Sequence, residues 1–270
     1  MSVTVLDAHV HFYPQYDEHE FLQSALSNFA RLRQMSEIDA DGGQTPEPEQ
    51  DPISGILCLT ESHRCRWFDG LAGTVGQWQV GDCGEPYSKR LESPTGERLI
   101  VISGRQVITS ERLEVLVLGT NRIPDDGEPA SRVIDAALAD DCLVILPWGF
   151  GKWWFQRGRV IAQLIQDYGA KIQLGDNSGR ATLLPKPRLL RHGQEQGLKI
   201  LSGSDPLPLP GEVHNVARLG VALDSTVDAQ FPFAWLKAQV ARQQPREIGN
   251  REGVARFLKN QLLMQIKKQR

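Results

Sequence analysis

This 270-residue sequence lacks several patterns that point directly to a function. Its four cysteines, Cys58, Cys65, Cys83 and Cys142, show none of the close pairings that are typical of zinc knuckles or redox motifs, so we expect reduced thiols. No glycine-rich dinucleotide or phosphate loop follows any predicted strand. A zinc knuckle, a dithiol redox centre and a dinucleotide-binding fold are therefore not expected.

Long apolar runs and an excess of positive charge are missing as well. No stretch reaches the roughly 20 apolar residues that a membrane span needs. The first residues, Met1 to Leu6, include no positively charged region of the kind that begins a signal peptide. The formal net charge is −3, whereas nucleic-acid binding normally calls for a basic patch. We therefore expect a cytoplasmic protein that binds neither a membrane nor nucleic acid.

The order of the predicted elements indicates a single α/β domain over residues 1–270. A hydrophobic content of 40% and a charged content of 23% are ordinary values for a globular chain. In the second half, short apolar strands alternate with helices, which is typical of βαβ units and a parallel sheet. A barrel and an open doubly wound sheet both fit this pattern. Strands are predicted at 143–147, 171–174 and 199–201, and helices at 154–168, 185–196, 212–222 and 232–242.

The first half alternates less regularly. Residues 39–52 are acidic and rich in glycine and proline, so they are predicted to form a surface loop. Residues 64–98 are predicted to be an irregular insertion, and residues 247–270 a C-terminal helix that closes the domain. The remaining predictions are strands at 3–12, 53–60, 99–102, 106–109 and 113–118, and helices at 19–34 and 126–140.

The first predicted strand runs into Asp7-Ala8-His9-Val10-His11. Alternate residues of a strand point to the same side, so Asp7, His9 and His11 are expected on one face. Two imidazoles at this spacing can bind one metal ion at distances of about 2.0–2.1 Å. Barrel enzymes place their active sites at the C-terminal ends of the strands. We therefore predict that His9 and His11 are metal ligands, with a hydrogen-bonded structural pair as the alternative.

Charged residues follow several other predicted strands. Glu61 and His63 repeat the two-residue spacing after the second strand, although a surface loop with a solvated histidine is an alternative. Asp205 either completes a set of ligands with the two histidines or caps the next helix. Lys152 and Arg180 lie where a cation can hold an anionic substrate, or they are ordinary surface charges.

Three tryptophans, Trp148, Trp153 and Trp154, follow the strand predicted at 143–147. Core packing accounts for some of them. Three within seven residues at the rim of a fold can also line a pocket.

Together these positions resemble the PHP superfamily, which is named for its polymerase-associated and histidinol-phosphatase members. Asp7-Ala8-His9-Val10-His11 is similar to the opening His-x-His segment of the family, and Gly203-Ser204-Asp205 is similar to its closing Gly-Ser-Asp. Thr60-Glu61-Ser62-His63 is similar to its Thr-Asp-His segment, with Ser62 interposed. The resemblance extends to about residue 223 and implies a distorted (β/α)7 TIM-like barrel with a C-terminal helical extension. It also implies metal-dependent chemistry, often the hydrolysis of phosphoesters.

The sequence departs from the family at several ligand positions. Gln106 and Glu114 stand where the family offers a bridging glutamate and then a histidine, and a metal-binding histidine is either replaced by Trp148 or lost. Pro206 and Leu207 stand where the family has Ala-His. Neither a neutral amide nor an indole can bridge two ions as a carboxylate does. The usual trinuclear cluster is therefore not expected, and the resemblance leaves one or two ions.

The leading hypothesis is a PHP-type metal-dependent hydrolase, most simply a phosphoesterase, that uses Mn²⁺, Zn²⁺ or Fe²⁺ and a metal-activated water. Its substrate would be small and anionic, possibly phosphorylated. A related variant is an amidohydrolase, and the alternative of another class is a PHP-like barrel that has lost catalysis and acts as a binding or regulatory module. The predicted roles are metal ligands for His9, His11, Asp205, Gln106 and Glu114, catalysis for Asp7, Glu61 and His63, and substrate binding for Lys152 and Arg180.

Overall fold

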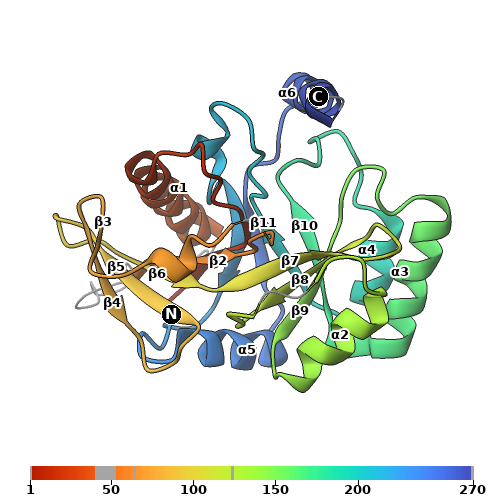
Figure 1. The fold of residues 1–270 in the computed structure, drawn as a ribbon, viewed down its shortest axis with the longest axis horizontal. Helices are drawn as coiled ribbons and strands as arrows, with labels where there is room; N and C mark the ends of the chain where they lie inside the picture. Colours follow the sequence, from red (N-terminus) through yellow and green to blue (C-terminus); the bar gives the residue numbers. More distant parts are fainter. Residues whose placement is uncertain (1, 40–52, 64, 123–124, 269–270) are drawn as a thin grey trace.

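The computed structural model describes residues 2–39, 53–63, 65–122 and 125–268. The acidic loop predicted at 39–52 lies outside these ranges except for Asp39. The described part is a mixed α/β structure with two β-sheets and six α-helices (Figure 1).

The strands of the described part form a larger and a smaller sheet, and chain order is not preserved in the larger one. The eight-stranded sheet has the order β13 (Arg246–Gly249), β12 (Leu219–Leu223), β1 (Thr4–Val10), β2 (Ile53–Leu59), β6 (Arg98–Ile102), β5 (Ser88–Glu92), β4 (Trp78–Asp82), β3 (Thr74–Val75). The five-stranded sheet has the order β11 (Ile200–Gly203), β10 (Gln173–Asn177), β9 (Leu143–Pro147), β8 (Glu114–Leu118), β7 (Gly104–Ile108).

The two sheets share one hydrophobic core. Leu6 and Ile100 of the larger sheet pack in the same cluster as Ile145 and Leu201 of the smaller sheet. Both edges of the smaller sheet meet the middle of the larger one, because β11 contacts β1 and a β-bridge joins Arg105 of β7 to Glu61, which follows β2. The structure thus has two abutting sheets within the described ranges rather than the closed barrel that the resemblance implied.

Strand direction explains why the barrel does not close in its regular form. The pairs β1–β2, β2–β6, β9–β10 and β10–β11 are parallel, as expected for βαβ units. The pairs β7–β8, β8–β9 and β1–β12 are antiparallel. The turn between β7 and β8 is too short for the crossover that parallel strands need, so this pair forms a hairpin.

Helices cover the outer faces of the two sheets (Figure 1). Helix α1 packs on the larger sheet through Phe21 and Phe29. Ile134, Ile161 and Leu190 pack on the smaller sheet from three successive helices. The helices are α1 (Glu18–Asp39), α2 (Ala130–Ala139), α3 (Phe155–Tyr168), α4 (Arg188–Glu195), α5 (Pro232–Arg242) and α6 (Val254–Lys268).

Two segments differ from the sequence-based predictions. The helix predicted over 212–222 is replaced by a short 3-10 turn at Glu212–Asn215 and by strand β12. All five residues of β12 are buried between β1 and β13, and periodicity alone cannot distinguish such an apolar run from a buried helix. The segment 64–98, predicted to be irregular, contains β3, β4 and β5, which extend the larger sheet.

The predicted C-terminal helix is present as α6, but it is only partly packed. Phe257 and Asn260 are buried, whereas Leu258 and Leu262 are each 60% exposed. Within the described ranges, no helix has the length and apolar character that a membrane crossing requires.

The buried ion pair at the junction of the sheets gives a stability prediction. Arg105 Nη1 donates to Glu61 Oε2 at 2.7 Å, and both side chains are buried. Replacing Arg105 with methionine leaves a buried carboxylate unpaired, so we expect a loss of about 3–5 kcal/mol in the free energy of unfolding. Urea denaturation measures it.

The controls for this prediction separate charge from packing. The double variant Arg105→Met, Glu61→Gln is expected to recover part of the loss, because it buries no unpaired charge. Arg132→Ala removes an exposed pair with Glu128 and should change stability by less than about 1 kcal/mol. A wild-type midpoint for Arg105→Met would contradict the structural role of the pair.

Candidate metal centre

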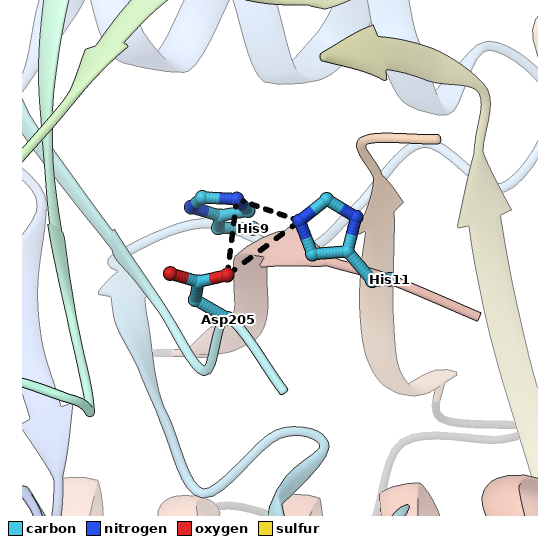
Figure 2. A group of neighbouring side chains, drawn as sticks. All are labelled: His9, His11 and Asp205. Carbon is cyan, nitrogen blue, oxygen red and sulfur yellow. Dashed lines mark hydrogen bonds and ion pairs between the residues drawn. The ribbon is translucent and has the colours of Figure 1, made fainter. Parts of the chain in front are cut away.

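His9, His11 and Asp205 converge at the end of β1 (Figure 2). His9 Nε2 and His11 Nε2 lie 3.1 Å apart, and each lies 3.5 Å from Asp205 Oδ1. Both histidines are buried, and the Asp205 side chain is 26% exposed. Among the described residues, this is the one group of at least three histidine, cysteine or acidic side chains that could hold a metal ion.

The spacing of these three atoms fits a single ion. Bonds of about 2.1 Å, at angles between octahedral and tetrahedral, separate neighbouring ligand atoms by about 3.0–3.4 Å. Gln106 Oε1 lies 3.2 Å from His9 Nε2, so a neutral carbonyl oxygen is available beside the group. Two imidazoles with a carboxylate suit Zn²⁺, Fe²⁺ or Mn²⁺ better than Ca²⁺, which prefers oxygen ligands only.

Strand β1 is irregular where it delivers the two histidines. Its register with β2 shifts between Asp7 and Val10. Ala8 packs between the sheets, whereas Val10 packs under α1, so the simple alternation of faces is broken. The two imidazoles still meet, but the Asp7 carboxylate turns away from them toward Ser204.

Asp205 is held in place by its own backbone and by a neighbouring amide. Its φ of 48° lies in the left-handed region, which costs a non-glycine residue about 1–2 kcal/mol. Its N–H donates to the His9 carbonyl at 2.8 Å. Asn177 Nδ2 donates to Asp205 Oδ2 at 2.9 Å and leaves Oδ1 facing the histidines. Ligand geometry here is fixed by strand ends rather than by a flexible loop.

The Asp7 carboxylate anchors the segments that carry the ligands. It accepts hydrogen bonds from the N–H groups of His9, Ser204 and Ala217, and from the Ser204 hydroxyl. Burial raises its pKa to about 7, and these donors oppose the shift. Because both oxygens are occupied by donors, Asp7 positions the site.

Burial and charge set the protonation preferences of the ligands. Burial lowers the pKa of His9, although Asp205 opposes the shift, so the imidazole favours the neutral form that binds metals. Burial alone would raise the pKa of Asp205, but His9, His11 and Lys152 together hold it below its usual range. His9 is therefore suited to act as a neutral donor and Asp205 as an anionic donor.

Glu61 and His63 lie apart from this group. Glu61 binds Arg105, and its Oε1 accepts the Trp67 N–H at 2.6 Å. Burial raises the pKa of Glu61, opposed by these two donors. His63 is half exposed, and its Nδ1 lies 3.1 Å from Asp126.

Glu114 and Lys152 form an ion pair close to the group. Lys152 Nζ donates to Glu114 Oε1. Burial lowers the pKa of Lys152, but Glu114 and Asp205 together raise it above the usual value, so the ammonium stays charged. Glu114 and Lys152 also act electrostatically on the pKa of His9.

Arg180 faces a different set of partners. Its guanidinium binds Asp176 through Nε and Nη2 and the Leu184 carbonyl through Nη1. Arg251 shares the same aspartate at 2.9 Å. A buried carboxylate therefore already engages Arg180.

Sequence reasoning did not single out Asn177, Ser204 or Tyr13 as site residues. Asn177 and Ser204 act through hydrogen bonds to Asp205 and Asp7 that only the assembled fold brings together. The Tyr13 ring lies 5.5 Å from the His11 ring, and its spacing continues the 9, 11 pattern of β1. That spacing was the one available signal for Tyr13.

Comparison with known proteins yields structural relatives but no sequence match. No family model matches the chain, and no curated protein does. Endonuclease Q of Pyrococcus furiosus, described as a lesion-specific endonuclease, aligns over 91% of this chain and 58% of its own with 15% identity and a TM-score of 0.50. PsfC from Pseudomonas syringae aligns over 100% and 99% with 13% identity and a TM-score of 0.48.

A second structure of endonuclease Q, in complex with a 27-mer duplex bearing an abasic lesion, aligns over 91% of this chain and 58% of its own with 15% identity and a TM-score of 0.49. The chain spans 58% of the endonuclease Q chain. The endonuclease Q structure with the TM-score of 0.50 has a PHP-like α/β fold, which is consistent with the PHP resemblance at the level of fold.

The expectation that nucleic acid is excluded was wrong. A neighbour of the same fold is described as a lesion-specific endonuclease, a class of enzyme that acts on nucleic acid. A net charge of −3 is a sum over the whole chain and does not describe the local distribution of charge. Between Trp148 and Arg191 there are eight lysines and arginines and two aspartates, a local charge of +6.

The group of His9, His11 and Asp205, called the triad below, predicts stoichiometric metal binding. Wild-type protein loaded with Mn²⁺ or Zn²⁺ and then desalted should retain about one equivalent, and His11→Ala should retain less than about a tenth, because two ligands do not close a site. Elemental analysis measures both. His192→Ala removes an exposed histidine that contacts Gln196 and should leave the metal content unchanged. Equal metal content in wild type and His11→Ala would contradict the assignment.

The close approach of β11 to β1 gives a second prediction. A Cβ on Gly203 would lie 2.3 Å from His9 N and 2.7 Å from Asp7 Oδ1. Gly203→Ala should therefore cost about 1–3 kcal/mol of stability and weaken metal binding. Urea denaturation and metal titration measure the two effects. Gly70→Ala, where no atom lies within 4 Å of the added Cβ, is the control, and identical results for the two variants would refute the packing argument.

Proposed function

We propose that this protein is a metal-dependent phosphoesterase with one divalent ion held by His9, His11 and Asp205. The observation that carries the proposal is the convergence of His9 Nε2, His11 Nε2 and Asp205 Oδ1 within 3.5 Å of one another. The PHP-like fold and the likeness to endonuclease Q support a hydrolase. All four cysteines are unpaired, which fits the proposed cytoplasmic location.

The residues around the triad divide the remaining tasks. A bound divalent ion would supply a Lewis acid and lower the pKa of a coordinated water to about 7. The Lys152 ammonium, beside Glu114 and Asp205, would hold an oxygen of an anionic phosphoester. Gln106 would offer its carbonyl oxygen near His9. Asp7 and Asn177 keep the ligand-bearing segments in position.

We infer one ion rather than two. A second ion near Glu61 or Glu114 would need their free carboxylates, but Glu61 is neutralised by Arg105 and Glu114 by Lys152. Each pair already balances the negative charge that would attract a cation. We therefore assign Lys152 to the substrate, and we assign Glu61 and Arg180, which is held by Asp176, to the framework.

The ion pairs of Glu61 with Arg105 and of Glu114 with Lys152 also favour a second candidate function, in which the protein is not a catalyst. A site that has replaced metal ligands with internal ion pairs is what loss of catalysis would leave behind. Under that alternative, the triad binds an ion, and the protein acts as a binding or regulatory module without turnover.

One activity assay separates the two candidates. Protein loaded with Mn²⁺ or Zn²⁺ is tested against p-nitrophenyl phosphate and bis(p-nitrophenyl) phosphate. We expect metal-dependent release of nitrophenol that Asp205→Ala abolishes, while circular dichroism reports an intact fold. Stoichiometric metal with no turnover of either ester would reject the phosphoesterase and favour the binding module.

Lys152 gives a more specific prediction for the same assay. Lys152→Gln should lower kcat/KM by about 10- to 100-fold, since one charge-assisted contact to the substrate is lost. The metal content should stay at the wild-type level, because Lys152 is not a ligand. Lys171→Gln removes an exposed lysine that lies before β10 and should leave kcat/KM unchanged. Loss of metal in Lys152→Gln, or unchanged kcat/KM, would contradict the role.

A further inference from the structure

A cavity of about 350 Å³ lies beside the end of β9. Its walls come from the segments 148–154 and 184–189, and four of its lining residues are aromatic. Trp148 and Trp153 are buried, whereas Phe150 is 41% and Trp154 49% exposed. We call this feature the tryptophan cavity.

The aromatic side chains of the tryptophan cavity are held in place by contacts with one another and with the neighbouring helices. The Phe150 ring contacts both Trp154, at 5.0 Å between centroids, and Phe257 of α6, at 5.1 Å. Arg157 Nη2 donates to the Gly151 carbonyl and so ties the loop to α3. Exposed aromatic rings that are held in place are costly to hydrate, and a cluster of them beside a cavity marks a binding surface.

One cation lines the tryptophan cavity, and the chain segment that forms its walls is rich in positive charge. Arg188 lines it, and the stretch from Trp148 to Arg191 has a net charge of +6 in a chain of net charge −3. An apolar ligand would need no such charge, and a small inorganic anion would need no aromatic walls. Aromatic rings next to cations are the combination that binds nucleic-acid strands, through base stacking and phosphate contacts.

The cavity and the metal centre share one loop. The Trp148 carbonyl accepts a hydrogen bond from Asn177 Nδ2 at 3.0 Å, and the same amide nitrogen donates to Asp205. Lys152, between Phe150 and Trp153 in the chain, points its ammonium to Glu114 at the metal centre. A ligand with a phosphate at the metal centre and a flat ring in the cavity would therefore run along this loop.

We propose that the tryptophan cavity stacks a base of a single-stranded nucleic acid whose phosphodiester lies at the metal centre. The inference rests on the proposed phosphoesterase function and names its substrate class. A single strand is specified because the bases of a duplex are stacked on one another and do not offer their faces. Trp154 provides the exposed stacking face, and Arg188 a phosphate contact.

The test measures binding without chemistry. Fluorescence anisotropy in EDTA gives the Kd of wild-type protein for a labelled 12-residue oligothymidine and for an equally charged oligomer that lacks bases. We expect the base-free oligomer to bind about 5- to 100-fold more weakly, which is the range for one stacked base. Equal affinity for the two oligomers, or no binding of either, would overturn the proposal.

Variants locate the effect in the cavity. Trp154→Ala should lose most of the preference for oligothymidine over the base-free oligomer, and Trp154→Phe should retain it. Phe231→Ala, at an exposed aromatic residue preceding α5 and outside the cavity, should behave like wild type. An unchanged preference in Trp154→Ala would overturn the assignment of the cavity.

The two proposals fail separately in these assays. Binding in EDTA does not depend on the metal or on turnover. Base-dependent binding without hydrolysis would reject the phosphoesterase alone, and hydrolysis of simple phosphoesters without base-dependent binding would reject the stacking site alone.

Discussion

The geometry of the candidate site depends on one buried carboxylate. Asp7 accepts four hydrogen bonds, which tie β1 to the end of β11 and to the segment before β12. His9 lies two residues after this anchor, and Asp205 directly follows Ser204, which supplies two of the donors. Residues that are almost 200 positions apart in the chain are thereby held within bonding distance of one ion.

The structure also shows how charge is balanced around a site with few metal ligands. Arg105 neutralises Glu61, and Lys152 neutralises Glu114. Fixed cations thus stand beside carboxylates that could otherwise attract further ions. The negative charge outside the three-ligand group is therefore already balanced. The same loop that carries Lys152 carries the aromatic rings of the tryptophan cavity, so it connects the candidate metal centre with the proposed base-stacking site.

The sequence predicted the local features well and the long-range ones less well. The spacing of His9 and His11 predicted their meeting, and the apolar periodicity predicted α1, α3 and α5. The burial of β12 was missed, because an apolar run of five residues is compatible with a strand or a helix. The ion pairs of Glu61 and Glu114 could not be predicted, since their partners come from β7 and from the loop after β9. In the proposed one-ion site, those pairs occupy the carboxylates that a second ion would need.

Anomalous diffraction from crystals grown with Mn²⁺ tests the central claim most directly. The account predicts one anomalous peak per chain, within about 2–2.5 Å of His9 Nε2, His11 Nε2 and Asp205 Oδ1. A peak beside Glu61 or Glu114, or no peak at the three ligand atoms, would contradict it.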